Sequence, residues 1–347
     1  MKKLILAGVI LIAILVDMPW LATNVHALTY SDNGVWIQDT SWMSANPNIL
    51  TMNLSKVVDD LSHGNFRFAF VFAGYWNADT NTIMYNENDS VFTAVINALH
   101  AVNIEVLAWV ENDGAINVSA GNRQLLYNQI TACMNKGFDG YNDDIEDWNG
   151  TLQSWIDYEN NCTTVLHGLG KLMTTDVELD WQQNTNPYLH VDYIVSMFYS
   201  NVSALESPDA AVSWQEYFGE YLGHDTPPGS PMIMGIMNYY SNEYPLSWQL
   251  EQVGKYLAIY GHPELVGFSL WPYEYMGTNA DDWGQWNNWI TTEIPEYQLT
   301  LFPMLFVIAA LLVAARFGVS ARNRGRVLDH PTKPGSKEHT ARESSST

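Results

Sequence analysis

The sequence predicts an α/β protein in which eight parallel strands close into a (β/α)8 TIM barrel, followed by a single C-terminal transmembrane helix. Short apolar runs alternate with segments of helical spacing, which is typical of a parallel sheet with helical crossovers. There are eight such runs, within about 270 residues, close to the roughly 250 residues of these barrels. No glycine-rich phosphate loop follows a run, so an open nucleotide-binding sheet is not favoured.

Strands that are buried on both faces are expected to be almost continuously apolar. The eight predicted strands are Val35–Gln38, Phe66–Ala73, Glu105–Val110, Phe138–Ile145, Lys171–Val177, Tyr193–Tyr199, Met232–Tyr239 and Val266–Trp271. The predicted helices are Met52–Leu61, Ser90–Ala101, Asn122–Met134, Leu152–Leu169, Ala210–Leu222, Leu246–Ile259 and Asp281–Ile290. Only the link Glu178–Asp192 has no regular pattern.

Residues 1–27 are predicted to be a signal peptide. Lys2 and Lys3 precede the apolar stretch Leu4–Val16, and Val25-His26-Ala27 fits a cleavage site. An uncleaved signal anchor is the alternative, although the stretch is shorter than the ~20 residues of a bilayer span. Cleavage leaves residues 28–298 as an extracellular barrel domain.

Residues 299–315 are predicted to be a transmembrane helix, because they carry no charge and are followed by a cluster of arginines. A buried core helix is the alternative. The tail 316–347 is basic and rich in serine, which is typical of a disordered segment. The sequence therefore predicts a single-pass cell-surface protein with the barrel outside and the tail in the cytoplasm.

The charge of the barrel domain excludes one class of partner. Residues 28–298 hold 34 acidic and 6 basic side chains, so the domain cannot bind nucleic acid by neutralising phosphates. Its two cysteines, Cys133 and Cys162, form either a disulfide, which an exported domain permits, or a pair of free buried thiols.

The segment Gly137–Trp148 is an unusually acidic run. Asn142, Asp144 and Glu146 alternate along a predicted strand, so they are expected to share one face. A buried carboxylate must be paired or hydrogen-bonded. A carboxyl held protonated beside another one is what general acid catalysis on a glycosidic bond requires.

Polar and aromatic residues also follow the other predicted strands, where barrel enzymes carry their catalytic groups. Together they suit a sugar site, because sugar faces stack on rings while hydroxyls need polar partners. The predicted substrate-binding residues are Asn142, Trp271, Trp109, Tyr75, Asn238 and Tyr239. Asp176 and Glu178 are interpreted as ordinary loop-facing acids, and Asp143 and Asp147 as facing the helix layer or the loop.

The stretch Asp139–Glu146, DGYNDDIE, resembles the DGxDxDxE signature on the fourth barrel strand of glycoside hydrolase family 18, the chitinases and endo-β-N-acetylglucosaminidases. Met197-Phe198-Tyr199 resembles the MxY of the sixth strand in that family. Trp271 resembles the tryptophan that forms the floor of the sugar site. The resemblance covers the barrel only, from about Val35 to Trp289.

The resemblance implies a retaining mechanism in which the substrate's own N-acetyl group is the nucleophile. Glu146 would be the acid, Asp144 would orient the acetamido group, Tyr199 would hydrogen-bond it, and Trp271 would lie beneath the sugar. The partner implied is a carbohydrate polymer or glycan with N-acetyl groups. Asn142 stands where most members have aspartate; chitobiase-like and spore peptidoglycan hydrolase-like members also have asparagine there.

Other interpretations remain open. Asp144 and Glu146 could be structural acids at a strand end, and Tyr199 and Trp271 could be core aromatics. A barrel that binds glycans without cleaving them is a second hypothesis, motivated by Asn142 and by Ser200, which follows Tyr199 where many family members have aspartate. A third is a glycosidase with two catalytic carboxylates, Glu146 with Glu178 or Glu111. No HExxH or CxxC spacing occurs, so neither a metal site nor a cofactor is predicted.

Overall fold

The computed structural model describes residues 30–38, 54–177, 186–198, 215, 218–219, 230–237, 245–260, 264–276 and 280–291. All of them belong to one compact unit, Met1–Pro295. The predicted signal peptide at 1–27, transmembrane helix at 299–315 and tail at 316–347 lie outside the described residues and stay predictions. None of the helices in the described part of the chain is long and apolar enough to cross a membrane.

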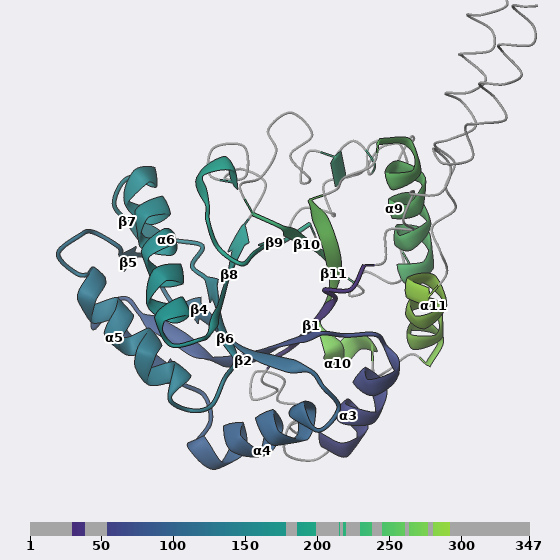
Figure 1. Cartoon of the computed structure of the whole chain (residues 1–347), viewed down its shortest axis with the longest axis horizontal. Helices are drawn as coiled ribbons and strands as arrows, with labels where there is room; N and C mark the ends of the chain where they lie inside the picture. Colours follow the sequence, from purple (N-terminus) through teal and green to yellow (C-terminus); the bar gives the residue numbers. More distant parts are fainter. Residues whose placement is uncertain are drawn as a thin grey trace, which may run out of the picture. The chain divides into compact units, whose positions relative to one another are not determined.

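Eight parallel strands form a closed barrel (Figure 1). In order round the barrel they are β1 (Gly34–Ile37), β2 (Phe68–Asn77), β4 (Glu105–Asn112), β6 (Gly140–Asp144), β8 (Leu172–Val177), β9 (Tyr193–Ser196), β10 (Met232–Met237) and β11 (Leu265–Trp271). Strand β11 pairs with β1 and closes the ring. All eight predicted strands are confirmed, and with them the (β/α)8 barrel.

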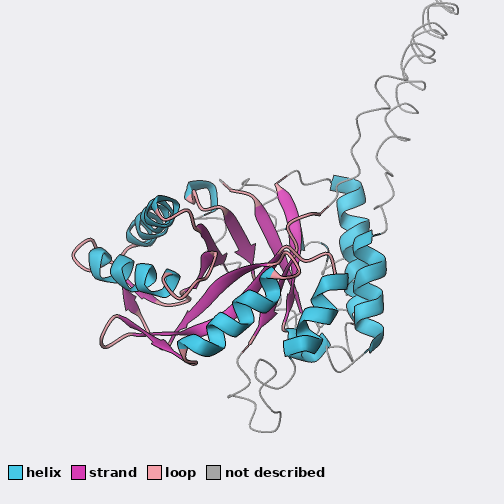
Figure 2. Ribbon diagram, turned by 60° about the horizontal axis from the view of Figure 1, so that its bottom comes forward, coloured by secondary structure: helices cyan, strands magenta, loops and turns pink. Residues whose placement is uncertain are grey.

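Helices surround the strands (Figure 2). Those between or after the strands are α3 (Leu54–His63), α4 (Asp89–His100), α5 (Arg123–Met134), α6 (Leu152–Gly168), α9 (Leu246–Tyr260) and α11 (Ala280–Thr291). Each agrees with its predicted range to within two residues. Side-chain caps start two of them: Asn88 accepts from the backbone of Ser90 and Val91, and Thr151 from that of Ser154. Most of the predicted helix Ala210–Leu222 lies outside the described residues.

The barrel has an aromatic interior. Its buried cluster is separate from the larger apolar core between strands and helices. The rings of Trp36 and Phe70 stack at 4.5 Å, and Trp109 meets Trp36 edge-on at 5.0 Å. The interior cluster consists of Trp36, Phe68, Phe70, Phe72, Leu107, Trp109, Val195 and Ile233. Residues in register with these side chains on neighbouring strands also point inward.

Several short elements are absent from the prediction. Strand β3 (Thr82–Tyr85) runs antiparallel to the end of β2, and the turn between them is capped by Asn77, whose Oδ1 accepts from the backbone of Thr80 at 3.0 Å. The others are β5 (Ile116–Asn117), β7 (Trp148–Asn149), the short helix α10 (Tyr273–Met276) and the 3-10 turn η2 (Asn186–Tyr188). Of these, β5 and β7 pair with each other and hold a segment of the site.

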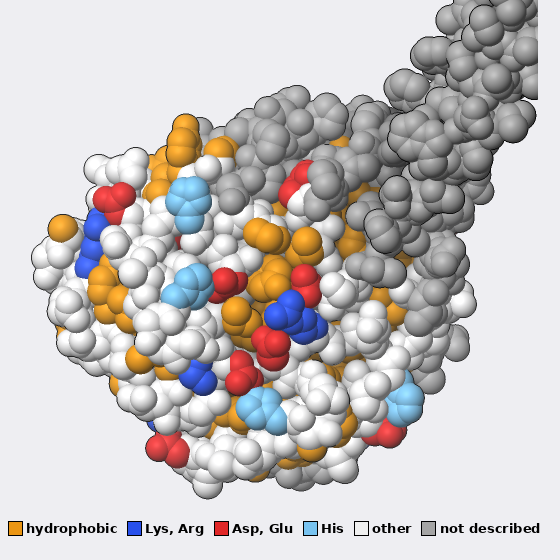
Figure 3. Space-filling model, in the orientation of Figure 1, with side chains coloured by type: hydrophobic (Ala, Val, Ile, Leu, Met, Phe, Trp, Pro, Cys, Tyr) orange, Lys and Arg blue, Asp and Glu red, His pale blue; other side chains and the backbone are white. Residues whose placement is uncertain are grey.

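Basic side chains are scarce, as Figure 3 shows for one face. All six of the barrel domain lie in the described part of the chain. Five of them form ion pairs: Lys56–Asp60, Arg67–Asp32, Arg123–Asp157, Lys136–Asp89 and Lys255–Glu251. The sixth, Lys171, lies directly before β8.

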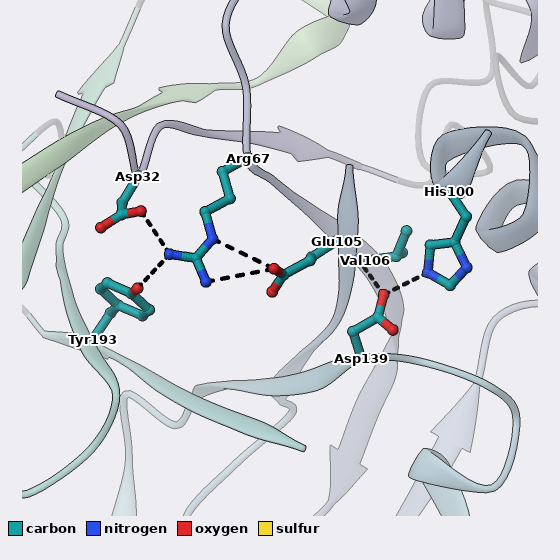
Figure 4. Close-up of polar contacts among 7 residues, drawn as sticks. All are labelled: Asp32, Arg67, His100, Glu105, Val106, Asp139 and Tyr193. Atoms are coloured by element: carbon teal, nitrogen blue, oxygen red, sulfur yellow. Dashed lines mark hydrogen bonds and ion pairs between the residues drawn. The ribbon is translucent and has the colours of Figure 1, made fainter. Parts of the chain in front are cut away.

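Arg67 joins the N-terminal ends of four strands (Figure 4). It donates to Asp32 Oδ1 at 2.6 Å, to the Tyr193 hydroxyl at 2.8 Å and to Glu105 Oε1 at 3.4 Å. Its guanidinium also lies 4.6 Å from the centre of the Phe68 ring. The polar groups at the N-terminal end of the barrel therefore hold strands together. The candidate site described below lies at the C-terminal ends of the strands.

Cys133 on α5 and Cys162 on α6 are both buried free thiols. Burial raises the pKa of the Cys133 thiol to about 12. Of the two possibilities that the sequence leaves open, the structure has the free thiols.

Candidate active site

Strand β6 directs two polar side chains into the barrel. Asn142 pairs in register with Trp109 of β4 and with Thr174 of β8, and Trp109 belongs to the interior cluster. Asn142 therefore points inward, and so does Asp144, two residues further along. Asn142 is fully buried, and Asp144 is 7% exposed. The predicted common face of these two residues is confirmed.

Glu146 lies beyond the strand, so strand alternation does not set its direction. Strand β6 ends at Asp144, and Glu146 is exposed in the following loop. The Glu146 backbone N–H donates to Oδ1 of Asn112 at 3.0 Å. Asn112 Nδ2 in turn donates to the carbonyls of Gly114 and Asp147, each at 2.9 Å. Asn112, at the end of β4, thus fixes the loop that carries Glu146.

The same loop continues into the small β5–β7 sheet. Ile116 pairs in register with Trp148, and the Trp148 ring stacks on Trp155 of α6 at 5.4 Å. Asn149 Nδ2 donates to the carbonyl of Ala115 at 3.0 Å. Glu146 is therefore held over the C-terminal ends of β4 and β6 by backbone contacts on both sides.

Asp144 is held by one neutral donor in an otherwise acidic environment. The indole Nε1 of Trp109 donates to Asp144 Oδ2 at 2.8 Å. Burial raises the pKa of Asp144 well above its usual range, and the negative charges of Glu146 and Glu111 raise it further. The Trp109 hydrogen bond acts in the opposite direction. Asp144 is thus a carboxyl that retains a proton more readily than an exposed aspartate.

Glu111 is a third carboxyl at this end of the barrel. It pairs in register with Asp144 on one side and with Tyr75 on the other, so the three lie on one level. Glu111 is partly buried. Burial, and then the negative charge of Glu146, raise the pKa of Glu111 to about 7. With this pKa the carboxyl can be protonated near neutral pH, so Glu111 is a candidate catalytic carboxyl.

Asp176 is a fourth carboxyl inside the barrel, and its interpretation as a loop-facing acid is wrong. It lies in β8 and is 2% exposed. Asn142 Nδ2 donates to Asp176 Oδ1 at 3.0 Å and to Thr174 Oγ1 at 2.9 Å. Thr174 and Asp176 share a strand face, and that face is the inward one. Burial raises the pKa of Asp176 well above normal, and the negative charge of Asp144 raises it further.

The predicted aromatic residues divide by exposure. Trp271, at the end of β11, is partly exposed and packs against the interior cluster. Tyr75 is also partly exposed. Trp109 is only 1% exposed, with its ring between Trp36 and Phe72. Trp109 and Asn142 therefore offer no surface to a ligand in this structure; Trp109 donates to Asp144 instead, and Asn142 to Asp176.

The remaining predicted site residues, Tyr199, Asn238 and Tyr239, lie outside the described residues. Met197 and Phe198, which precede Tyr199, are buried. Within the part of the chain that the structure describes, no group of three or more His, Cys, Asp or Glu side chains is arranged to hold a metal ion.

Asp143 faces the helix layer, in contrast to its neighbours in the strand. The hydroxyl of Tyr141 donates to Asp143 Oδ1 at 3.0 Å, and Trp76 Nε1 donates to that hydroxyl at 2.8 Å. Burial raises the pKa of Asp143 to about 6. Burial, and then the charge of Asp143, raise the pKa of Glu159 on α6 well above normal. Both residues are fully buried, whereas Asp147 is exposed in the loop.

Two comparisons with known proteins, both by sequence, found no match. No family model matches the sequence. No curated protein matches it either.

Solved structures are similar in fold. A chitinase from Chromobacterium violaceum has a TM-score of 0.52 at 13% identity, over 76% of this chain and 99% of that one. The spore cortex-lytic enzyme SleL from Bacillus cereus has a TM-score of 0.53 at 12% identity, over 76% of this chain and 75% of that one. Catalytic domain 2 of a Group II chitinase from Ostrinia furnacalis has a TM-score of 0.52 at 11% identity, over 75% and 96%. At these identities the likeness shows a shared barrel fold.

Proposed function

We propose that the barrel is a glycoside hydrolase of the family 18 type, which cleaves β-linked N-acetylhexosamine glycans such as chitin or peptidoglycan. The observation that carries the proposal is a buried Asp144, whose pKa is raised in part by the charge of Glu146, next to an exposed Glu146 at the C-terminal end of β6. The register of these acids resembles the family signature, and the fold is shared with proteins that are described as chitinases.

In this proposal each described residue has a separate task. Glu146 is exposed and can reach the glycosidic oxygen, to which it gives its proton as the bond from the sugar's anomeric carbon breaks. The acetamido carbonyl oxygen of the same sugar attacks that carbon and forms an oxazolinium ion. Asp144, as a carboxylate, orients the acetamido N–H and stabilises the positive charge.

The second half of the reaction returns the acid to its starting state. A water molecule attacks the anomeric carbon, gives a proton to Glu146 and reopens the oxazolinium ring, so the product keeps the configuration of the substrate. Trp271 supplies a partly exposed ring beneath the sugar. Tyr199, Asn238 and Tyr239 complete the site in this proposal.

A second candidate is a glycosidase that uses two carboxylates of the protein, Glu146 and Glu111. The raised pKa of Glu111, about 7, favours it, because a carboxyl that stays protonated near neutral pH can serve as a general acid. The two mechanisms differ in what they require of the substrate. Only the first needs an acetamido group beside the cleaved bond.

A panel of substrates tests the proposal. Wild-type protein is incubated with chitin oligomers, peptidoglycan fragments, N-glycans and matched oligomers that carry a hydroxyl in place of the acetamido group, and products are identified by mass spectrometry. Cleavage that depends on the acetamido group, with retained configuration by NMR, is expected. Cleavage of the hydroxyl oligomers contradicts the substrate-assisted mechanism. Calorimetric binding without products over a long incubation contradicts hydrolysis and supports a glycan-binding barrel.

The placement of the enzyme is also part of the proposal: an exported barrel anchored by residues 299–315, with the tail 316–347 in the cytoplasm. The support is the sequence pattern of both ends. Protease treatment of intact cells is expected to remove the barrel and spare an epitope placed in the tail. Loss of the tail epitope under the same treatment contradicts this topology.

A further inference from the structure

Three oxygen atoms inside the barrel have no hydrogen-bond donor among the described residues. They are Oδ1 of Asn142, Oδ1 of Asp144 and Oδ2 of Asp176. Each residue is at least nine-tenths buried, with exposed fractions of 0%, 7% and 2%. A buried acceptor without a donor costs roughly 1–3 kcal/mol of stability. A proton carried by one of the two carboxyls would supply such a donor.

Both hydrogens of the Asn142 amide are already used. Nδ2 donates to Thr174 Oγ1 and to Asp176 Oδ1, both on β8. Because the amide is planar, its Oδ1 is turned away from β8. Asp176 therefore fixes the orientation of the Asn142 side chain. Because Asp143 pairs in register with Thr175, Asp176 lies level with Asp144 on the interior face, one position beyond the pair of Asn142 and Thr174.

No cation in the described part of the chain can neutralise this group. Five of the six basic side chains of the barrel domain form ion pairs elsewhere. Lys171 lies before the start of β8, about 16 Å along the strand from Asp176 at ~3.3 Å per residue. Within the described residues, the charged groups with the largest effects on the pKa values of Asp144 and Asp176 are acidic: Asp143 on β6, Glu146 after it and Glu111 on β4. Asp176 also raises the pKa of Glu159 on α6.

Two buried carboxyls without a cation cannot both be ionised at neutral pH, since like charges and burial each disfavour the second charge. We propose that Asp144 and Asp176 hold one proton between them, and that Asp176 is a positioning residue which keeps this proton when Asp144 is ionised. The pair then carries one negative charge in both arrangements. This inference rests on the proposed function, in which Asp144 must be a carboxylate when positive charge develops on the sugar.

The consequence for the reaction is specific to this chain. Asp176 raises the pH at which Asp144 ionises, and it lies on a different strand from the acidic run. The proton released by Asp144 is the one that Asp176 takes up, so no net proton leaves the interior. The two carboxyls therefore titrate as a coupled pair.

The test is a titration that needs no substrate. Protein with ¹³C-labelled aspartate is titrated, and the carboxyl carbons of Asp144 and Asp176 are followed by NMR. Coupled, two-step curves for both residues are expected in the wild type. In Asp176→Asn, which still accepts from Asn142, Asp144 is expected to titrate in one step, about half a unit to one unit below its second wild-type step, because the negative charge that opposes that step is absent. The control Asp192→Asn, at the opposite end of the barrel, leaves Asp144 unchanged.

Independent single-step curves in the wild type, or an unmoved Asp144 curve in folded Asp176→Asn, overturn the inference. The wild-type curves decide the question even if the variant does not fold. In active enzyme, the acidic limb of the kcat/KM profile is expected to move to lower pH in Asp176→Asn. A wild type that cleaves no glycan overturns the proposed function, whereas the coupled titration of Asp144 and Asp176 is still decided by NMR.

Discussion

The indole Nε1 of Trp109 lies 2.8 Å from Oδ2 of Asp144, across adjacent strands of the barrel. Trp109 is held in place by the rings of Trp36 and Phe72. The aromatic interior therefore positions the Trp109 indole, which donates to the proposed catalytic carboxyl of Asp144.

Replacing Trp109 by Phe is expected to lower stability by about 1–3 kcal/mol, since a buried acceptor loses its donor. The hydrogen bond lowers the pKa of Asp144, so its loss should move the acidic limb of the kcat/KM profile to higher pH. Urea unfolding and pH-dependent kinetics measure the two effects. Trp36→Phe is the matched control, because Trp36 donates at 3.2 Å to the neutral hydroxyl of Ser269. An equal shift of the limb in both variants contradicts the role assigned to Trp109.

Replacing Glu111 by Gln separates the two mechanisms. The charge of Glu111 raises the pKa of Asp144, so in the substrate-assisted mechanism the variant stays active and its acidic limb moves to lower pH. In the two-carboxylate mechanism activity is lost by about 10²-fold or more. Steady-state kinetics across pH distinguishes the outcomes. Glu105→Gln is the control, because Glu105 starts the same strand and contacts Arg67 at the other end.

Replacing Asn112 by Ala is expected to lower kcat about tenfold or more with little change in KM, because the loop that positions Glu146 loses its contacts to β4. Asn149→Ala is the control: it removes a contact between the same two loops without touching Glu146. Equal effects of the two changes show that general loosening of the loops, rather than the placement of Glu146, is responsible.

The Asp143–Glu159 pair predicts how stability depends on pH. The folded-state pKa of Asp143 is raised to about 6, above the ~4 of an unfolded chain. The stability that this pair contributes is therefore fully present below about pH 4. It is lost as the pH rises through about 6, and further through the raised pKa of Glu159.

In Glu159→Gln, the free energy of unfolding should fall by about 1–3 kcal/mol less between pH 4 and 7 than in the wild type. The glutamine amide is neutral at every pH and can donate to Asp143. Urea unfolding at several pH values measures this difference. Asp157→Asn, on the exposed side of the same helix, is expected to leave the slope unchanged. A variant slope equal to that of the wild type contradicts the contribution assigned to Asp143 and Glu159.

Sequence predicts the barrel well because its strands are buried on both faces, so apolar runs mark them directly. Sequence alone places Tyr75 less securely. The pairing register shifts between Phe72 and Gly74, which brings Tyr75 level with Glu111 and turns Trp76 to the outer core. Gly74 has φ +152°, and a Cβ there would lie 2.1 Å from the Met84 carbonyl oxygen. This glycine is the only local signal of the irregularity.

The acidic run was sufficient to predict Asn142 and Asp144 as inward-facing neighbours, because both lie within a strand. It could not predict Asp176, since the contact with Asn142 depends on the register between β6 and β8. A sequence signal is present: three consecutive polar residues, Thr174, Thr175 and Asp176, interrupt an apolar strand, and the first and third of them share a face. Asn112 likewise acts through a loop of another segment, which no spacing within β4 reveals.

In the proposed function, Glu146 is the acid of a glycoside hydrolase. This role is tested most directly by the rates at which wild type, Glu146→Gln and Asp147→Asn hydrolyse the oligosaccharide that the wild type cleaves best. Asp147 is the matched control, because it is the adjacent exposed acid of the same loop. We expect Glu146→Gln to lose about 10²–10⁴-fold in kcat, with Asp147→Asn close to wild type. A Glu146→Gln variant as active as the wild type contradicts this role of Glu146.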